Sequence, residues 1–336
     1  MVMQSAPKIS IIIVIWNAGG HFSSCLSALS RQTEKEFEIV VIDNGSTDGV
    51  VEDLSCGPEF HIVVKKMEKN LGFAVANNLG ARLARGEWIV LLNADAYPEP
   101  DWLEQLLKTA KQNPDYNFFS SRQIQYNSPH LLDGAGDDYH VSGLAWRRYY
   151  NHTREEYGLK QEEVFGACAA AAMYRREDFL KVGGFDEDYF SYFEDVDLSF
   201  RLRLAGGKCL YVPQAVVHHV GSASTGKISD FVVYHGHRNL VWAYFKDMPS
   251  YLFWVYLPLH LVMNLYFMIS FILKGKGQAI LKAKWDALRG LPASLRKRRM
   301  IQKMRTVPVS EIYRWMSRGI LEPYWASRQR KQEGRR

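Results

Sequence analysis

The sequence predicts an α/β fold built on a doubly wound, mostly parallel sheet with helices on both faces. Short runs rich in β-branched residues recur along the N-terminal part of the chain, and the segments between them have helical composition or spacing. Polar turn-forming residues follow each run. Runs as continuously apolar as these are typical of parallel strands that are buried on both faces. The predicted strands are Ile9–Ile15, Phe37–Ile42, His61–Val64 and Trp88–Leu92.

The composition is that of a globular protein with one large domain and an appendage, since the chain has 336 residues and 47% of them are hydrophobic. The early apolar run Ile11–Trp16 is too short for the hydrophobic region of a signal peptide, so we expect a buried strand there. The four cysteines lie far apart without a CxxC pair, which argues against a zinc site or a disulfide framework and favours a reducing cytosolic compartment. They are Cys25, Cys56, Cys168 and Cys209.

Hydrogen-bonding side chains follow all four predicted strands. In a sheet of this class, ligands bind at the carboxyl ends of the strands, near the point where strand order reverses. Each residue alone is an ordinary turn former or helix cap, but four such strand ends together favour a ligand crevice. The residues are Asn17, Asp43, Asn44, Ser46, Asp48, Asn70, Gly72, Asn93 and Asp95.

Two common nucleotide-binding motifs are absent, because no GxGxxG follows the first strand and no GxxxxGK[ST] occurs in the chain. Their absence argues against a dinucleotide-dependent dehydrogenase and a P-loop enzyme. A diphosphate would then be held through a metal ion, for which Asp95 is placed at the rim of the sheet. Mg²⁺ and Mn²⁺ share hard oxygen ligands with phosphate, so one protein carboxylate can suffice.

An acidic and aromatic segment, residues 185–203, contains the second candidate site. Its pattern predicts a helix from Glu194 to Ala205, with Glu194, Asp195 and Asp197 in the first turn. Acidic residues at this position stabilise the start of a helix without any catalytic role, so a structural and a catalytic interpretation both remain open.

Four further segments complete the predicted catalytic part. Residues Gln123–Glu163 form either a surface excursion or a segment for acceptor recognition. The small residues of Gly166–Met173 predict a strand that a ligand approaches closely, although tight packing explains them equally well. His218 and His219 follow a predicted strand, Ala215–Val217, and only one of them can face the crevice. The segment Asp230–Lys246, which contains Arg238 and Asn239, is predicted to be helical.

In this order the motifs resemble the inverting glycosyltransferases of family 2, which have the GT-A fold. The resemblance covers residues 9 to about 247 and implies a catalytic domain at 1–247, with a nucleotide-sugar half at about 1–122 and an acceptor half at about 123–247. The matching stretches are Trp16-Asn17, DNGSTD (43–48), NLGFAVANN (70–78), Asn93-Ala94-Asp95 in place of the DxD motif, Glu194-Asp195 as the ED motif, and His218 ahead of Gly221 and Ser224.

The resemblance assigns roles to these residues. Asp43 would bind the nucleobase or ribose, Asp95 and His218 the Mg²⁺ or Mn²⁺ ion and the diphosphate, and Asp195, next to Glu194, the acceptor hydroxyl. Displacement of a diphosphate from an anomeric carbon needs such a base and such positive charge, and no covalent nucleophile. Asn93 departs from the motif, so one carboxylate remains for the metal. The other implied donor-binding residues are Asn17, Asn44, Ser46, Asp48, Asn70, Gly72, Asn77 and Asn93.

The C-terminal segment, residues 248–336, predicts membrane association. Tyr251–Leu273 has no formally charged residue and is long enough to cross a bilayer. Residues 274–336 contain 18 Lys and Arg against four Asp and Glu, a charge of +14 that leaves −8 for residues 1–273. A single span would place this basic part away from the cytosolic enzyme. We therefore predict a hairpin or in-plane helix, broken near Pro258, and a basic amphipathic segment on anionic lipid at the cytoplasmic face of the membrane.

Two alternatives for this segment are a single span and a buried helical pair of a soluble homodimer. A nucleic-acid partner is not expected, because no nucleic-acid-binding motif accompanies the basic residues.

The predicted function is transfer of a sugar from a nucleoside-diphosphate donor to a glycan or lipid-linked acceptor in cell-surface polysaccharide synthesis. The similarity is greatest to bacterial rhamnosyltransferase-like members, which suggests a dTDP-rhamnose donor. A nucleotidyltransferase on a similar sheet is one alternative, but it gives Asp195 no role. A catalytically silent nucleotide-sugar sensor or membrane scaffold is another, and the intact Glu194-Asp195 pair argues against it.

Overall fold

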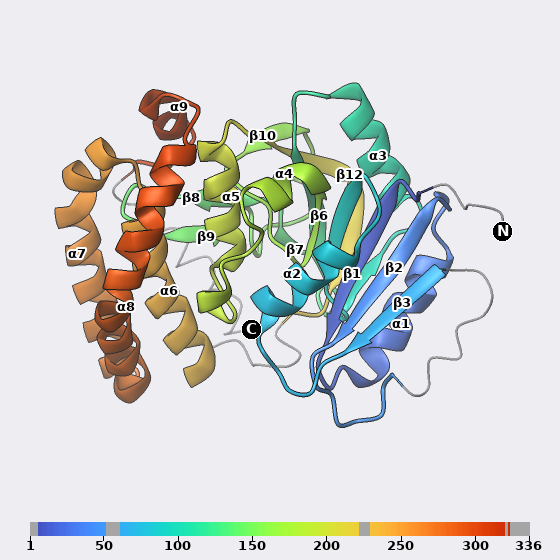
Figure 1. Cartoon of the computed structure of the whole chain (residues 1–336), viewed down its shortest axis with the longest axis horizontal. Helices are drawn as coiled ribbons and strands as arrows, with labels where there is room; N and C mark the ends of the chain where they lie inside the picture. The colour runs from blue at the N-terminus through green and yellow to red at the C-terminus, as the bar shows by residue number, and fades with distance from the viewer. Residues whose placement is uncertain (1–5, 52–60, 222–228, 320–321, 323–336) are drawn as a thin grey trace.

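The computed structural model describes residues 6–51, 61–221, 229–319 and 322. Within these ranges, one large mixed sheet and a small two-stranded sheet are combined with helices (Figure 1). The strands are β1 (Ile9–Ile15), β2 (Phe37–Asp43), β3 (His61–Lys66), β4 (Trp88–Leu92), β5 (Ala96–Pro98), β6 (Phe118–Gln125), β7 (Leu132–Gly134), β8 (Asp137–Tyr139), β9 (Ala145–Arg147), β10 (Glu162–Val164), β11 (Ala171–Arg175) and β12 (Cys209–His219). The helices are α1 (Gly19–Ser30), α2 (Phe73–Leu83), α3 (Trp102–Gln112), α4 (Arg176–Lys181), the 3₁₀ helix η1 (Glu187–Tyr189), α5 (Glu194–Leu204), α6 (Asp230–Asp247), α7 (Ser250–Leu273), α8 (Gly277–Met304) and α9 (Val309–Arg314).

The main sheet has the strand order β10-β12-β6-β11-β4-β1-β2-β3, with β5 beside β12 and β7 beside β6. The predicted α/β class is confirmed, and the four predicted strands β1 to β4 pair in parallel. The second half is mixed, because β11 lies antiparallel between β4 and β6 while β12 runs parallel to β6. Strand order therefore reverses beside β1, and the carboxyl ends of β4, β1 and β2 lie at one edge of the sheet.

Helices cover both faces of the sheet because the strands bury both sets of alternating side chains. Ile11 and Ile13 of β1 face α1 and α3, with Phe22 and Trp102 in the same core. Ile12 faces the opposite side, in a second core with residues of α2, α4 and α5. Figure 1 shows α6, α7, α8 and α9 grouped beyond α5, at the side of the molecule away from β3.

Four predicted strands differ in their limits, since β2 and β3 end one and two residues later, β12 is longer at both ends and β11 begins later. β3 is an edge strand, and Val64 on it is 40% exposed, so this run is not buried on both faces. The predicted strand Gly166–Met173 begins only at Ala171, since Ala169 and Ala170 form a turn. This turn brings backbone N–H groups to the crevice, as described below.

Helix α5 is buried on both sides. Leu198 and Leu202 face the sheet, whereas Phe200 and Leu204 join a third core with residues of α6, α7 and α9. Residues after 247 therefore share a core with the catalytic half. The predicted domain boundary at 247/248 stays a prediction.

The prediction of a break near Pro258 is wrong, since α7 runs continuously from Ser250 to Leu273. Pro258 lies on the exposed side of the helix, where its ring displaces no packed neighbour. The chain instead reverses after α7, where Gly275 has a φ of +74°, and α8 packs back against α7 and α6. Among the described helices, α7 is long and apolar enough to cross a membrane, by length and composition.

Candidate active site

The ends of β1 and β2 are joined by side-chain hydrogen bonds into one rim. Asp43, the last residue of β2, accepts a hydrogen bond from the backbone N–H of Ser46 at 2.9 Å. Asn17 Oδ1 accepts from the N–H of Thr47 at 2.8 Å, and Ser46 Oγ accepts from the N–H of Asn17 at 3.0 Å. Asp48 accepts from Gly19 at the start of α1, at 3.1 Å. The structure therefore brings these four predicted residues together at the carboxyl edge.

Asn44, Asn70 and Gly72 form a second group that holds the loop after β3. Asn44 Nδ2 donates to Asn70 Oδ1 at 2.9 Å and to the Gly72 carbonyl at 3.2 Å, and the side chain is almost fully buried. The Asn77 amide donates within α2 to the Phe73 carbonyl at 2.9 Å and is also buried. In this structure the Asn44 side chain holds the loop, and the Asn77 side chain is bonded inside α2.

Asp95 lies at the next strand end, in a chain of charged contacts. His219 Nε2 is 3.3 Å from Asp95, and His219 Nδ1 is 2.8 Å from Asp133, which forms an ion pair with Arg147. Burial lowers the pKa of His219, but the two carboxylates outweigh burial and raise that pKa to about 9. Burial raises the pKa of Asp95, but His219 outweighs it, so the pKa lies below its usual value. Asn93 Nδ2 lies 3.4 Å from His219 Nε2.

The structure does not bring His218 to Asp95. His218 Nε2 is 2.7 Å from Glu99, on the opposite side of β12, and its neighbour His219 occupies the position beside Asp95. The family resemblance implied His218 as the metal ligand, whereas the geometry favours His219.

Glu194 and Asp195 begin α5, where Glu194 is buried and Asp195 is mostly buried. Asp195 Oδ2 accepts a hydrogen bond from the N–H of Ala169 at 3.2 Å, in the turn before β11. Burial raises the pKa of Asp195, and the Ala169 N–H and Arg147 only partly offset that rise. Burial and the charge of Asp195 raise the pKa of Glu194 well above its usual value, and its Oε2 is buried without a hydrogen-bond partner.

Sequence reasoning missed Asp133, Asp137 and the specific position of Arg147. Arg147 interacts electrostatically with Asp133, Asp137 and Asp195, so it joins the Asp95 end of the crevice to the α5 end. Burial and the charge of Asp195 raise the pKa of Asp137 well above its usual value. The available signal was the location of Arg147 in the segment expected to recognise the acceptor, but the residues DGAGDD resemble an ordinary turn.

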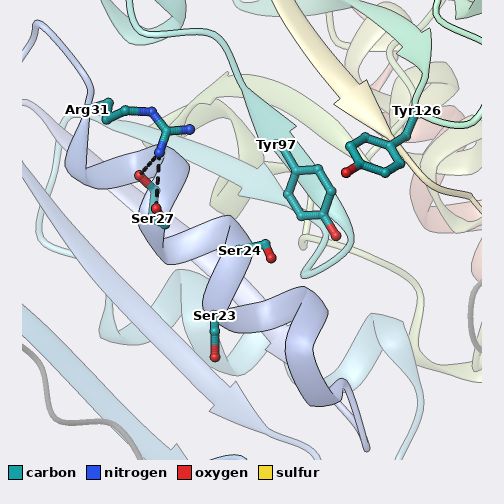
Figure 2. Close-up of a pocket in the computed structure, with 6 residues that line it drawn as sticks. All are labelled: Ser23, Ser24, Ser27, Arg31, Tyr97 and Tyr126. Atoms are coloured by element: carbon teal, nitrogen blue, oxygen red, sulfur yellow. Dashed lines mark hydrogen bonds between the residues drawn. The ribbon is translucent and has the colours of Figure 1, made fainter.

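A shallow depression lies beside this site, along the outer side of α1 (Figure 2). Tyr97, two residues after Asp95, reaches it from β5 and bonds to His21 Nδ1 at 2.6 Å. Tyr126 packs edge-on against Tyr97, with ring centroids 5.1 Å apart. The residues that line the depression include hydroxyl groups but no carboxylate, so they provide no general base for the transfer reaction. Its lining residues are Ser23, Ser24, Ser27, Arg31, Tyr97 and Tyr126.

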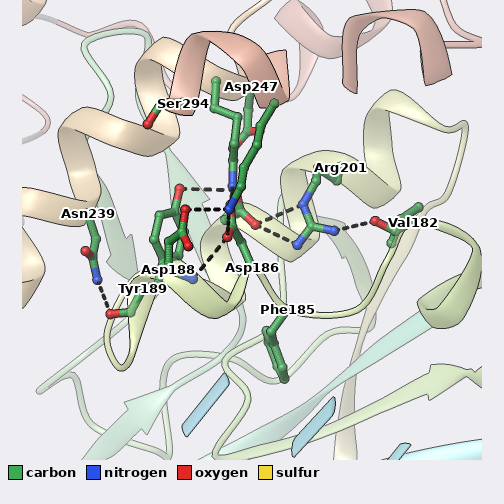
Figure 3. A network of polar contacts seen from close by, with 12 residues as sticks. Val182, Phe185, Asp186, Asp188, Tyr189, Arg201, Asn239, Asp247 and Ser294 are labelled. Atoms are coloured by element: carbon green, nitrogen blue, oxygen red, sulfur yellow. Dashed lines mark hydrogen bonds and ion pairs between the residues drawn. The ribbon is translucent and has the colours of Figure 1, made fainter. Parts of the chain in front are cut away.

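A buried ionic network fixes α5 against α6 and α8 (Figure 3). Asp197 is fully buried and accepts from Arg201 Nη2 at 2.6 Å, while Lys246 of α6 forms ion pairs with both Asp197 and Asp186. Lys297 of α8 pairs with Asp186. Burial raises the pKa of Asp186, but Lys246 and Lys297 more than reverse that effect and hold it well below its usual range. The acidic residue Asp197 of the predicted first turn therefore has a structural role.

The residues around Asp95 fit a divalent metal ion that is completed by a substrate. Among the described residues, no group of three or more His, Cys, Asp and Glu is arranged to hold a metal ion. Asp95 nevertheless offers oxygen ligands, and His219 Nε2 would add a nitrogen ligand beside them once a metal ion displaces its proton, while Asp133 holds the other nitrogen of His219. A histidine oriented by a second carboxylate is typical of metal ligands, and diphosphate oxygens can supply the remaining ligands.

Comparisons with known proteins identify the family and the fold. The model of the family described as "Glycosyl transferase family 2" matches residues 10–183. A protein of Mycobacterium tuberculosis, N-acetylglucosaminyl-diphospho-decaprenol L-rhamnosyltransferase, is 31% identical over 245 residues, which cover 65% of this chain and 77% of the relative.

Two solved structures have the same fold. GalNAc-T7 with UDP, GalNAc and Mn²⁺ superposes with a TM-score of 0.59 and 18% identity, over 74% of this chain and 49% of that one. A mannosyltransferase of Pyrobaculum calidifontis with GDP-Man and Mn²⁺ gives a TM-score of 0.51 and 16% identity, over 97% of this chain and 85% of that one. The chain thus spans about half the length of the first structure and most of the second.

Proposed function

Because the chain belongs to glycosyltransferase family 2 and is therefore a glycosyltransferase with the GT-A fold, we propose that it transfers a sugar with inversion from a nucleoside diphosphate to a lipid-linked glycan. The observation that carries the proposal is the chain of charged groups that runs from Asp95 through His219, Asp133 and Arg147 to Asp195.

Asp195 is the proposed base. Its raised pKa makes the carboxylate a stronger proton acceptor than an ordinary aspartate, which suits removal of the acceptor hydroxyl proton. The N–H of Ala169 fixes one carboxylate oxygen and Arg147 keeps positive charge nearby. Glu194 is more deeply buried, and its raised pKa favours the protonated form, so we assign it no proton transfer.

At the other end, Asp95 and His219 would hold Mg²⁺ or Mn²⁺ together with the diphosphate, and Asp43 would bind the nucleobase or ribose. The metal ion, when bound, neutralises charge on the departing diphosphate. Two observations support the assignment: the contact between His219 and Asp95, and the Mn²⁺ and nucleotide named with the two solved structures. Of the residues predicted for the donor, Asn17, Ser46 and Asp48 would form the rim.

The proposed donor and acceptor are based on the name of one relative. The Mycobacterium tuberculosis protein is named as a rhamnosyltransferase that acts on a diphospho-decaprenol-linked sugar. We propose dTDP-rhamnose as the donor and a polyprenyl-diphosphate-linked sugar as the acceptor. The two solved structures contain UDP and a GDP sugar, so the fold alone does not determine which nucleobase the donor carries.

The test of catalysis is Asp195→Asn. The variant keeps the size of the side chain but cannot accept a proton, so turnover should fall by about 10² to 10⁴-fold while donor binding persists. Asp101→Asn, which makes the same change just before the start of α3, is the matched control and should keep its turnover. Near-normal turnover of Asp195→Asn would show that Asp195 only stabilises the start of the helix. Retained nucleotidyl transfer by that variant would favour the nucleotidyltransferase alternative.

The proposed acceptor lies in a membrane, and α7 and α8 present a surface that could bind it there. Helix α7 exposes large apolar side chains, with Trp254 70% exposed and Leu265 52%, and α8 exposes Trp285. Exposed aromatic and aliphatic side chains beside many Lys and Arg residues match the chemistry of an anionic lipid surface. Because α8 also packs on α6, this geometry supports an in-plane helical hairpin rather than a detached anchor.

The membrane proposal is tested with whole protein and vesicles that contain anionic lipid. Trp254→Gln with Leu265→Gln should reduce co-sedimentation, while Leu159→Gln, at an exposed residue of the acceptor segment, should not. High salt should release only part of the wild-type protein, because apolar burial is not screened. The alternative is that a second copy of the chain covers this face. In that case the wild-type protein would be a homodimer that does not bind vesicles, and the double variant would be a monomer.

A further inference from the structure

The loop that leads into α5 has an unusual backbone. Phe190, Tyr192 and Phe193 have φ values of +63°, +67° and +73°, in the left-handed region that large side chains rarely adopt. These three residues end directly before Glu194 and Asp195. Backbone of this kind persists only where surrounding contacts hold it, and it concentrates at functional sites.

The start of α5 depends on this loop because its N-cap residue supplies no side-chain cap. Its N-cap residue is Phe193, in the left-handed conformation, with no side-chain hydrogen bond to the first turn. The Phe193 carbonyl accepts the N–H of Asp197 at 3.0 Å. The start of the helix, and with it the position of Asp195, is therefore set by the path of residues 189–193.

Asn239 of α6 holds this path. The side chain is fully buried, and Nδ2 lies 3.0 Å from the Tyr189 carbonyl, 3.0 Å from the Ser191 carbonyl and 2.7 Å from the Tyr192 carbonyl. Figure 3 shows the amide reaching Tyr189 from α6. A single amide group thus binds three carbonyl oxygens in a stretch of four residues.

Arg238 orients that amide and adds two contacts. Its Nε donates to Asn239 Oδ1 at 2.9 Å, which directs the Nδ2 group toward the loop. Its Nη2 donates to the carbonyls of Asp188 and Tyr189, at 3.1 and 3.0 Å. The guanidinium lies over the ring of Trp242, 4.3 Å from its centroid, so the donor itself is held in place.

The donor side of the crevice contacts the same loop from the opposite direction. The Phe190 carbonyl accepts the N–H of Phe73, the first residue of α2, at 2.6 Å. Gly72 has a φ of +91°, and a Cβ there would lie 2.6 Å from the Phe190 oxygen. Residues 189–193 are therefore held between α6 and the donor-side loop that contains Asn70 and Gly72.

We propose that Asn239, oriented by Arg238, is a positioning residue that holds residues 189–193 in their left-handed path and so fixes Asp195 for proton acceptance. This inference rests on the proposed function of Asp195. It assigns Asn239 no contact with substrate, and it predicts a loss in the chemical step rather than in donor binding.

The test uses Asn239→Asp, which keeps the shape and the Arg238 contact but removes the N–H donors, and the milder Arg238→Met. Misplacement of a catalytic group by about 1 Å costs about 10²-fold in rate, so kcat of Asn239→Asp should fall by about that factor. The KM for the donor should stay unchanged, and kcat of Arg238→Met should fall less. Asn78→Ala is the matched control, because the buried Asn78 holds the same segment by the Phe185 backbone, away from the left-handed residues.

Thermal unfolding of each variant identifies losses that come only from instability. The proposal predicts that Asn78→Ala lowers the melting temperature but retains kcat, while Asn239→Asp loses kcat at temperatures where it is folded. Normal kcat in folded Asn239→Asp, or equal losses of kcat in both variants, would overturn it. If Asn239→Asp does not fold, normal kcat in Arg238→Met overturns it. Normal turnover of Asp195→Asn would refute the proposed function itself, which separates the two failures.

Discussion

Replacement of Lys246 by Met should destabilise the protein through the buried network between α5 and α6. Lys246 is almost fully buried and pairs with Asp186 and Asp197, while burial and the charge of Asp197 raise the pKa of Asp247 well above its usual value, which favours its uncharged form. The variant leaves Arg201 as the cation beside Asp197 and Lys297 as the cation beside Asp186, so the buried network loses one positive charge between two carboxylates. Breaking a buried pair in this way costs about 3 to 5 kcal/mol. At about 2.1 cal/mol/K of unfolding entropy per residue, a chain of 336 residues loses roughly 4 to 7 °C in melting temperature.

Differential scanning fluorimetry at pH 8 measures this shift, with Lys276→Met as the control. Lys276 and Asp230 form an exposed Lys–Asp pair at the other end of α6, and such pairs contribute about 0 to 1 kcal/mol. The deficit of Lys246→Met should shrink toward pH 5.5, because protonation of Asp186 or Asp197 removes the excess buried negative charge. Equal shifts for both lysine variants, or a deficit that grows on acidification, would refute the reasoning.

Three further predictions concern the site. Asp43→Ala should weaken nucleoside and nucleoside diphosphate alike, whereas Asp95→Ala should weaken only metal-dependent binding of the diphosphate, and isothermal titration separates them; equal losses of nucleoside affinity would reject the assignment. His219→Ala should lower the affinity of the nucleotide-bound protein for Mn²⁺, while His218→Ala should leave that affinity unchanged. The opposite result would favour His218 as the metal ligand, as the family resemblance implies. Since the proposed base acts when deprotonated and the pKa of Asp195 is raised, kcat/KM should fall on acidification with an inflection above the usual aspartate value of about 3.9. An inflection at or below that value would contradict a buried base.

The strands were predictable because the signal is local. Ile9–Ile15 and Trp88–Leu92 are β-branched or apolar runs bounded by turn residues, and their limits in the structure are those predicted. The start of α5 at Glu194 was also predicted, although its left-handed N-cap Phe193 carries no sequence signal. The pairing of β11 between β4 and β6 is non-local, so the mixed half of the sheet could not be read from periodicity.

The choice between His218 and His219 shows why part of the site could not be predicted. Side chains alternate along a strand, but β12 changes register against β6 between Val212 and Val216. An irregularity of this kind changes which residues face the crevice, and the chain sequence does not reveal it. Asn239 was equally hidden, because its partners are backbone carbonyls of a loop almost 50 positions earlier.

The burial of α5 on both sides sets an order of events during synthesis. The strands of the main sheet and α5 have been synthesised by residue 219, whereas Lys297, which pairs with Asp186, follows α5 by 93 positions. At about 5 to 20 residues per second, that interval lasts roughly 5 to 20 s. Early in that interval, before α6 and α7 are synthesised, Phe200 and Leu204 lack the C-terminal part of their core. We expect the nucleotide end of the nascent enzyme to form first, and proton acceptance to begin only after α8 closes over α5.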